Sequence, residues 1–381
     1  MRVTARGGGW PDEDQLLLLH AVLDEPDVAR AAWRRWSARH GGIAELPDAT
    51  RRLLPQLARR LGELGAEGPL AEQVRERLPH AWTRNRMLLR TVSPALRALS
   101  EADLEPIPIK GAAIAASVTN GFAIRPMFDL DLLVRPEHAA RAGELLVAAG
   151  FEDVSPRGLA GTTRVAAGAG FRAADGSEID LHWRPVPQPG GEGGVWGRAR
   201  RGELGGAAVL LPAPEDMLVH ACAHGLSAGS TGPRWVADAV LAHAAADGAF
   251  AWEQLAGAAA EHGVGLVVEE ALRFLRAEGF LEVPDSALQA LAQFETRPGL
   301  LVHALLMRPA RLGPLAFHLE QFDHHRRGAG PDGKRPTVRG YLAREAARMG
   351  VDGRRGLAVH WARRARERAR DRSRAWRSPR S

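Results

Sequence analysis

The chain has 381 residues, of which 45% are hydrophobic and 25% charged, with a formal net charge of +6. This composition excludes a disordered chain and is typical of a globular protein of roughly two or three domains. No stretch approaches the roughly 20 apolar residues of a membrane span, so we expect no membrane partner. Residues 1–15 lack the apolar segment of a signal peptide, and the single cysteine, Cys222, is typical of a reducing compartment. We therefore expect a cytoplasmic protein.

Helical patterns fill residues 12–103. The segment DEDQLLLLHAVL begins with acidic residues and continues with an apolar face, and DVARAAWRRWSARH repeats this pattern. Pro79 and Pro94 are expected to break or kink the helices that contain them. The first part of the chain is therefore predicted to be a purely helical region.

The pattern changes at residue 106. PIPIK (106–110) is short and rich in β-branched residues and prolines, which predicts a strand. GAAIAASVTNG (111–121) is predicted to be a helix that begins at a glycine, and FDLDLLV (128–134) to be the next strand. Residues 136–150 have Pro at the start and Gly at the end, which is typical of a helix.

Shorter strands are predicted after this helix. FRAADGSEIDLHW (171–183) has the best hairpin signal, because Asp175-Gly176 is a dipeptide that tight turns between strands prefer. PQPGGEGGVWG (187–197) is predicted to be a loop and AAVLLP (207–212) the last strand. From Ala213 onward the helical patterns return.

The predicted fold class is α+β, with a small mixed β-sheet in an α/β core between two helical regions. The predicted domains are an N-terminal helical region over 1–103, the α/β core over 104–212, a C-terminal helical domain over 213–352 and an Arg-rich tail over 353–381.

Two carboxylates lie in the apolar run FDLDLLV. Asp129 and Asp131 are two residues apart, so in a strand they share one face with Cα atoms roughly 6.5 Å apart. Leu130, Leu132 and Val134 fall on the opposite face. Mg²⁺ prefers one or two protein carboxylates, and two such ions can clamp a reacting phosphoryl group. A strand with one solvent-exposed face would have the same D-x-D pattern. A metal site and an exposed strand face therefore both stay open as interpretations.

A third carboxylate strengthens the metal-site interpretation. In SEIDLHW (177–183) and the next residue, Asp180, His182 and Arg184 share the face opposite to the apolar residues. If this strand pairs with residues 128–134, Asp180 joins the cluster. His182 would then be a proton carrier or phosphate contact, and Arg184 a partner for an anion. The alternative is that Asp180 is an exposed hairpin residue.

The turn IKGAAIAAS offers a phosphate site upstream of the carboxylates. A helix that begins at Gly111 presents backbone N–H groups, and glycine lets a phosphate come close. Lys110 stands at this turn as one of only two lysines in the chain, which favours a role for a compact point charge. Arg125 precedes the carboxylate strand and is expected to reach the same polyphosphate. Ordinary surface charge is the alternative for both residues.

Two histidines, His220 and His224, lie four residues apart and therefore on one helix face. This spacing suits zinc, but the glutamate of an H-E-x-x-H motif is absent because Ala221 follows His220. We expect these histidines, together with Arg234 and Asp238, to line or brace the active-site cleft.

The order of these motifs resembles the uncharacterised nucleotidyltransferase family of the DNA-polymerase-β-like superfamily. Members of this superfamily resemble one another in three features: a Gly-Ser or Gly-Gly turn that opens a helix, a D-x-D strand, and a third aspartate on a later strand. The resemblance assigns these places to Gly111-Ala112, to Asp129 with Asp131, and to Asp180. Ala112 departs from the usual second residue of the turn. Residues 213–225 and 233–241 resemble helical segments of the same family.

The resemblance implies transfer of a nucleoside monophosphate from a nucleoside triphosphate, expected to be ATP, with Mg²⁺ or Mn²⁺ and release of pyrophosphate. It implies that Asp129 and Asp131 hold metal ions and that Asp180 holds the second metal or takes the acceptor's proton. The residues assigned to nucleotide binding are Lys110, Gly111, Arg125, His182 and Arg184. The resemblance does not identify the acceptor, which is expected to be a small molecule or a peptide. A peptide is included because some family members are associated with peptide natural-product gene clusters.

Three alternatives stay open at this point. Ala112 leaves open a catalytically inactive member that binds a nucleotide or a protein partner. The chemistry would be the same if the nucleotide were transferred to a protein side chain, as in toxin–antitoxin systems. The third alternative is a nucleic-acid-binding protein that uses the Arg-rich residues 355–381 to neutralise phosphates, although their Ala/Arg pattern is more typical of a solvated helix.

Overall fold

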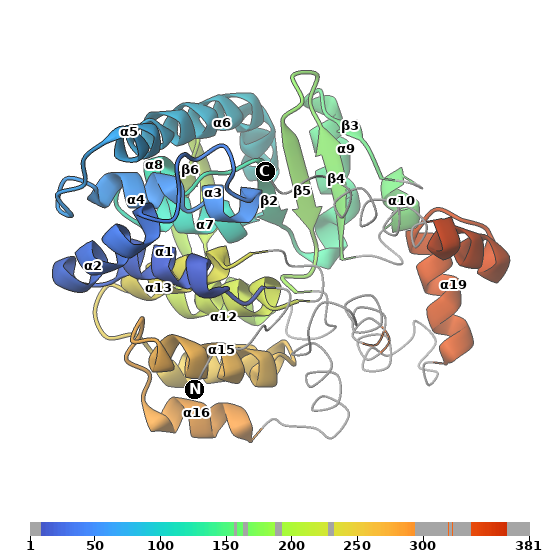
Figure 1. Ribbon diagram of the computed structural model, residues 1–381. Helices are drawn as coiled ribbons and strands as arrows, with labels where there is room; N and C mark the ends of the chain where they lie inside the picture. Colours follow the sequence, from blue (N-terminus) through green and yellow to red (C-terminus); the bar gives the residue numbers. More distant parts are fainter. Residues whose placement is uncertain are drawn as a thin grey trace.

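Helices come both before and after a small β-sheet in this chain, so the predicted α+β fold is confirmed (Figure 1). The structure is a computed structural model. It describes residues 9–155, 158–162, 167–186, 193–227, 232–293 and 337–363, together with Leu319 and Phe322.

The first part of the chain is helical, as its pattern predicts. Its helices are α1 (Glu13–Leu23), α2 (Pro26–Ser37), α3 (Asp48–Arg51), α4 (Leu54–Arg60), α5 (Pro69–Arg75) and α6 (Arg77–Glu101). Asp12 caps α1, since its Oδ1 accepts the Gln15 N–H at 2.8 Å and the Gln15 side chain accepts the Asp12 N–H at 3.1 Å. This reciprocal pair satisfies two N–H groups that a helix start leaves without partners.

The long helix α6, along the top of Figure 1, continues through both prolines that we expected to break or kink it. Pro79 lies in its first turn, where the missing N–H costs nothing. Pro94 lies inside the helix, where it removes one backbone hydrogen bond. The buried side chains Leu89, Val92 and Leu96 pack into the same core as the sheet. This burial outweighs the lost hydrogen bond, so the expected break is absent.

The sheet has the strand order β1-β2-β5-β4-β3. These strands are β1 (Ile107–Pro108), β2 (Asp129–Leu133), β5 (Glu178–His182), β4 (Gly168–Arg172) and β3 (Glu152–Asp153). The central pair β2 and β5 is parallel and the other pairs are antiparallel, which makes the sheet mixed, as predicted. The predicted hairpin is β4–β5, and Gly176 in its turn has φ +85°, a conformation that favours glycine.

Short elements connect and extend the sheet. They are α7 (Lys110–Ser117), α8 (Gly121–Ile124), the 3₁₀ turn η1 (Pro136–His138), α9 (Ala139–Ala148), α10 (Gly158–Thr162), α11 (Gly194–Arg198), β6 (Arg200–Leu204) and β7 (Ala207–Leu211). The predicted loop 187–197 lies partly outside the described residues and ends in α11. The strand β6 was not predicted, because RRGEL has no apolar alternation. With its partner β7 it forms a separate two-stranded sheet, which lies beside β1 where the Leu210 N–H donates to the Pro106 carbonyl at 3.0 Å.

The helical pattern predicted from Ala213 onward is confirmed over the described residues. The helices are α12 (Pro214–Gly225), α13 (Arg234–Ala244), α14 (Trp252–Glu261), α15 (Gly265–Ala277), α16 (Asp285–Ala292) and α19 (Val338–Arg348), and residues 353–363 are also helical. Residues 364–381 of the predicted Arg-rich tail lie outside the described part. Each helix that the structure describes is too short or too polar to cross a membrane.

The buried side chains form two large cores. The first core unites helices from both sides of the sheet in sequence, α1–α5 and α12–α16, through residues such as Trp36, Leu54 and Leu272. The second core packs α6, α9 and the β6–β7 hairpin against the five-stranded sheet. The domain boundaries predicted at residues 103, 212 and 352 stay a prediction. The first core contains side chains from both predicted helical regions, so the packing does not separate these regions.

Helix α7 belongs to both cores. Its residues Ala113 and Ile114 pack in the first core, whereas Ala112 and Ala115 pack in the second. The helix begins at Lys110, one residue after Ile109, whose N–H donates to the Asp131 carbonyl at 3.0 Å. The start of α7 is therefore fixed beside the carboxylate strand, at the junction of the two cores.

Candidate active site

The predicted carboxylates lie together on two adjacent parallel strands. Asp129 and Asp131 are on β2, Asp180 is on β5, and the register pairs Asp131 with Asp180. Neighbouring strands are about 4.8 Å apart, so the two paired side chains are direct neighbours. On the opposite face, Leu130 and Leu132 are completely buried in the second core. The alternation inferred from FDLDLLV thus places the carboxylates on one side of the sheet.

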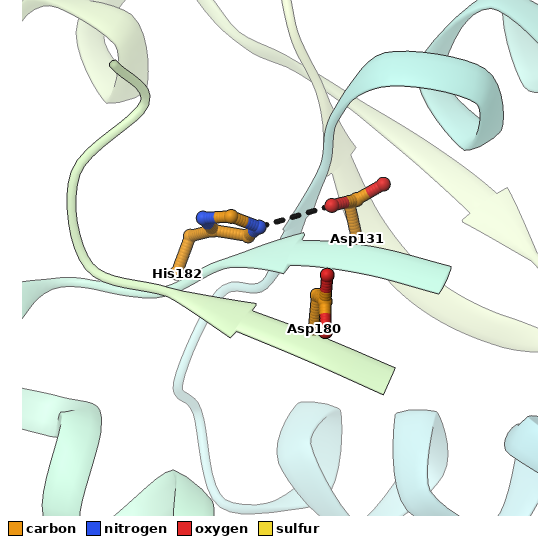
Figure 2. A group of neighbouring side chains, drawn as sticks. All are labelled: Asp131, Asp180 and His182. Carbon is orange, nitrogen blue, oxygen red and sulfur yellow. Dashed lines mark hydrogen bonds and ion pairs between the residues drawn. The ribbon is translucent and has the colours of Figure 1, made fainter. Parts of the chain in front are cut away.

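Asp131 is the centre of this cluster. It is only 4% exposed, and its Oδ1 accepts a hydrogen bond from Lys110 Nζ. The same oxygen accepts a second hydrogen bond from His182 Nε2 at 3.0 Å (Figure 2). Lys110 has φ +52°, in the left-handed region that is unfavourable for a residue with a side chain. Such strain is tolerated where the surrounding structure enforces it, and here it directs the ammonium group to Asp131.

The electrostatics differ among the three carboxylates. Burial opposes the ionisation of Asp131, but the hydrogen bond from His182 and the charge of Lys110 outweigh it and lower the pKa of Asp131 below its usual range. Burial and the negative charge of Asp131 raise the pKa of Asp129 and the pKa of Asp180. One lysine therefore does not compensate the negative charge of the cluster.

This cluster fits a divalent cation. Asp131, Asp180 and His182 each offer one ligand atom, and these atoms all lie within 4.8 Å of one another. Figure 2 shows Asp180 and His182 on β5 beside Asp131 on β2. Carboxylate oxygens are the preferred ligands of Mg²⁺ and Mn²⁺, and a further cation would relieve the repulsion that raises the pKa of Asp180. Asp129 does not belong to this three-residue group. It lies two residues before Asp131 on the same face of β2.

Arg125 connects the start of α7 to the C-terminal helices. Its Nε and Nη2 donate to Asp238 of α13 at 2.6 and 2.8 Å, and its Nη1 donates to the Pro126 carbonyl at 2.8 Å. All three nitrogens of the guanidinium are thus engaged inside the protein. The expected contact between Arg125 and a triphosphate would require this buried ion pair to break.

A cavity of about 340 Å³ lies beside Lys110. Its walls come from α3, α7, α12 and α13, so it lies against the junction of the two cores. The four residues that we expected to line or brace the cleft from the helical domain all line this cavity: His220, His224, Arg234 and Asp238. That this cavity is the active-site cleft stays a prediction, because the three aspartates of the cluster are not among its described lining residues.

The two histidines of α12 are packed as neutral side chains. Their rings are nearly parallel, with centroids 5.8 Å apart. Burial lowers the pKa of His220 well below its usual value and the pKa of His224 to about 4. Neither belongs to the three-residue group around Asp131. They therefore offer uncharged hydrogen-bonding groups to the cavity.

Comparison with known families agrees with this geometry. The profile of the family described as "Uncharacterised nucleotidyltransferase" matches residues 49–277, a range that contains the sheet, the carboxylates and helices α4–α15. The chain belongs to this family. The resemblance drawn from the K-G, D-x-D and I-D-L-H motifs is thus confirmed, and membership supports a general nucleotidyltransferase role. No curated protein matches the chain.

Two further residues, Arg184 and Arg52, lie near the site. Arg184 lies beyond the end of β5, and burial together with the charge of Arg184 lowers the pKa of Arg344 on α19. The predicted contact of Arg184 with an anion stays a prediction. Arg52, directly after α3, was not predicted, yet it lines the cavity and lies 4.7 Å from the Phe128 ring. No sequence motif marks it, because α3 is a single turn far from the carboxylate strand.

Gly111 allows the close approach of Arg125. A Cβ atom at this position would lie 3.0 Å from Arg125 Nη1, and Asp238 holds that guanidinium in place. Gly111→Ala is therefore expected to lower the free energy of unfolding by about 1–3 kcal/mol, as for other overpacked sites. Urea unfolding monitored by circular dichroism measures this change.

The matched control is Gly257→Ala in α14, where an added Cβ meets no atom within 4 Å. Alanine is the better helix former, so this variant should be unchanged or up to about 1 kcal/mol more stable. A Gly111→Ala protein as stable as Gly257→Ala would contradict the packing argument.

Proposed function

We propose that this protein transfers a nucleoside monophosphate from a nucleoside triphosphate to an acceptor and releases pyrophosphate. The observation that carries the proposal is the parallel register of β2 and β5, which pairs Asp131 with Asp180 beside Lys110. Family membership supports the reaction class. We propose ATP as the donor and a small molecule or a peptide as the acceptor.

Asp129, Asp131 and Asp180 are the residues that would hold Mg²⁺ or Mn²⁺ in this proposal. When bound, such ions neutralise the charge of the phosphates and orient the reacting oxygens. His182 supports the arrangement through its hydrogen bond to Asp131. The protein's own contribution is mainly positioning and charge neutralisation.

The start of α7 is the proposed phosphate site. Its N-cap residue, Ile109, forms no side-chain hydrogen bond to the first turn. The first N–H groups of a helix have no partner within the helix, so in α7 they are available to phosphate oxygens. Lys110 stands at the same place as a point charge, and Gly111 supplies one of these N–H groups.

The proposed chemical step balances without an added oxidant or reductant. An acceptor hydroxyl oxygen forms a bond to the α-phosphorus, the bond from that phosphorus to the bridging oxygen of the β-phosphate breaks, and pyrophosphate leaves with the electron pair. Asp180, half-buried beside Asp131, accepts the proton of the hydroxyl.

The test is to incubate the protein with each α-³²P-labelled nucleoside triphosphate, Mg²⁺ or Mn²⁺, and a cell extract. The expected result is a labelled product together with an equal amount of pyrophosphate, and neither should form with EDTA. The label's destination separates a small molecule, a peptide and a protein side chain. Nucleotide that binds without release of pyrophosphate would contradict the proposal and favour the inactive alternative that Ala112 leaves open.

A further inference from the structure

Arg234, the first residue of α13, lines the cavity without an ion-pair contact to any residue in the described part of the chain. Its Nη1 is inaccessible to solvent and forms no hydrogen bond with the residues that the structure describes. The neighbouring Arg125 shows the opposite arrangement, since Asp238 and the Pro126 carbonyl take all three of its nitrogens. An unsatisfied buried donor is unfavourable, and more so for a charged group, so Arg234 requires an explanation.

The charges that line the cavity do not balance. Its three acidic residues are each paired with an arginine other than Arg234: Asp48 with Arg51, Asp216 with Arg198, and Asp238 with Arg125. Arg52 and Arg234 also line the cavity, and neither forms an ion pair with a described residue. Arg52 instead lies against the Phe128 ring. Arg52 and Arg234 therefore face the cavity without an ion-pair contact to a described residue, and the carboxylates of Asp238 and Asp129 act on Arg234 only through their charge.

These cations repel one another. Burial, together with the positive charges of Arg125 and Arg52, lowers the pKa of Arg234 to about 9. The guanidinium still carries its charge at neutral pH. A bound anion would remove both the repulsion and the missing hydrogen bond, because a guanidinium donates two parallel hydrogen bonds to a carboxylate or a phosphate.

We infer that Arg234 and Arg52 form an oxyanion-binding site in the cavity beside Lys110. Phosphate and carboxylate share the required chemistry, and they have two sources, the triphosphate of the nucleotide or an acidic group of the acceptor. The remaining wall includes Ile114, Met217 and Trp235, which suits the organic part of either molecule. The assignment of the source rests on the proposed function, whereas the anion site itself does not.

Inorganic tripolyphosphate is the probe for this site. Isothermal titration in buffer with EDTA compares the wild type with Arg234→Gln, Arg234→Lys and the control Arg141→Gln on the exposed face of α9. We expect the wild type and Arg141→Gln to bind equally and Arg234→Gln to bind about ten- to a hundredfold more weakly. The affinity of Arg234→Lys should lie between those of the wild type and Arg234→Gln. Lysine keeps the positive charge but lacks the planar guanidinium that donates two parallel hydrogen bonds. Equal binding by the wild type and Arg234→Gln would overturn the inference.

Thermal unfolding separates ligand binding from a structural role. Without ligand, Arg234→Gln should unfold at the same or a higher temperature than the wild type, because it removes a buried charge that has no partner. Tripolyphosphate should raise the melting temperature of the wild type and leave that of the variant unchanged. If ligand-free Arg234→Gln melts at a lower temperature than the wild type, Arg234 stabilises the fold, and the inference is overturned.

Competition identifies the source of the anion. If ATP displaces tripolyphosphate, the site takes the triphosphate, and if both bind at once, it takes the acidic group of the acceptor. Asp180→Asn should keep tripolyphosphate binding in EDTA even though it is expected to lose nucleotidyl transfer. Failure of the proposed reaction and failure of this inference are therefore distinguishable.

Discussion

Asp131→Asn should reduce nucleotidyl transfer by at least about 10³-fold while the protein stays folded. Asp131 is the shared acceptor for Lys110 and His182 and a member of the candidate metal group. Asparagine keeps the size of the side chain and still accepts a hydrogen bond, but it loses the charge that binds a cation. Release of pyrophosphate from α-³²P-labelled ATP in the presence of Mn²⁺ and a cell extract measures the effect.

The matched control is Asp175→Asn in the turn between β4 and β5. Asp175 is an exposed carboxylate that accepts a hydrogen bond from Thr91 at 2.6 Å, away from the candidate metal group. Its substitution should leave the rate unchanged. A normal rate in Asp131→Asn, with circular dichroism equal to that of the wild type, would rule out the carboxylate mechanism.

The ion pair between Arg125 and Asp238 should dominate the link between the sheet region and the C-terminal helices. Its side chains are 5% and 12% exposed, so removal of one partner leaves a buried charge. Arg125→Met is therefore expected to lower the free energy of unfolding by about 3–5 kcal/mol. The double variant Arg125→Met/Asp238→Leu should recover part of this loss, because no charge is left unpaired. Urea unfolding of the single and double variants measures the coupling.

The exposed pair Arg141–Glu144 of α9 is the comparison for this experiment. Its side chains are 60% and 66% exposed, so Arg141→Met should change the free energy of unfolding by less than about 1 kcal/mol. An Arg125→Met protein that unfolds at the same urea concentration as Arg141→Met would show that the buried pair is not a structural link.

The arrangement around Asp131 could be predicted because its signals are local. Alternation in FDLDLLV sets which side chains share a face, and Asp175-Gly176 marks the turn that returns the chain as a strand. The sequence does not state which strand pairs with which, so the contact between Asp131 and Asp180 was a conditional expectation. The parallel register of β2 and β5 satisfies it.

Other features could not be predicted, because they depend on contacts between distant segments. Arg125 carries the same sequence signal whether it binds a phosphate or Asp238, and only the packing of α13 decides which partner it meets. The cavity arises where α3, α7, α12 and α13 come together, so no single segment encodes it. The continuity of α6 across Pro94 likewise depends on burial against the sheet.

The composition of the first core has a consequence for biosynthesis. Helices α1–α5, which end at Arg75, leave the ribosome early, but residues that pack against them lie as far along the chain as Phe280, whose ring contacts His20 of α1. At ordinary rates of translation the interval is roughly ten to forty seconds. During that time the N-terminal helices expose apolar surface that α13 and the region of Phe280 cover later. We therefore expect a chain truncated before α13 to keep this apolar surface exposed and to aggregate more readily than the full chain.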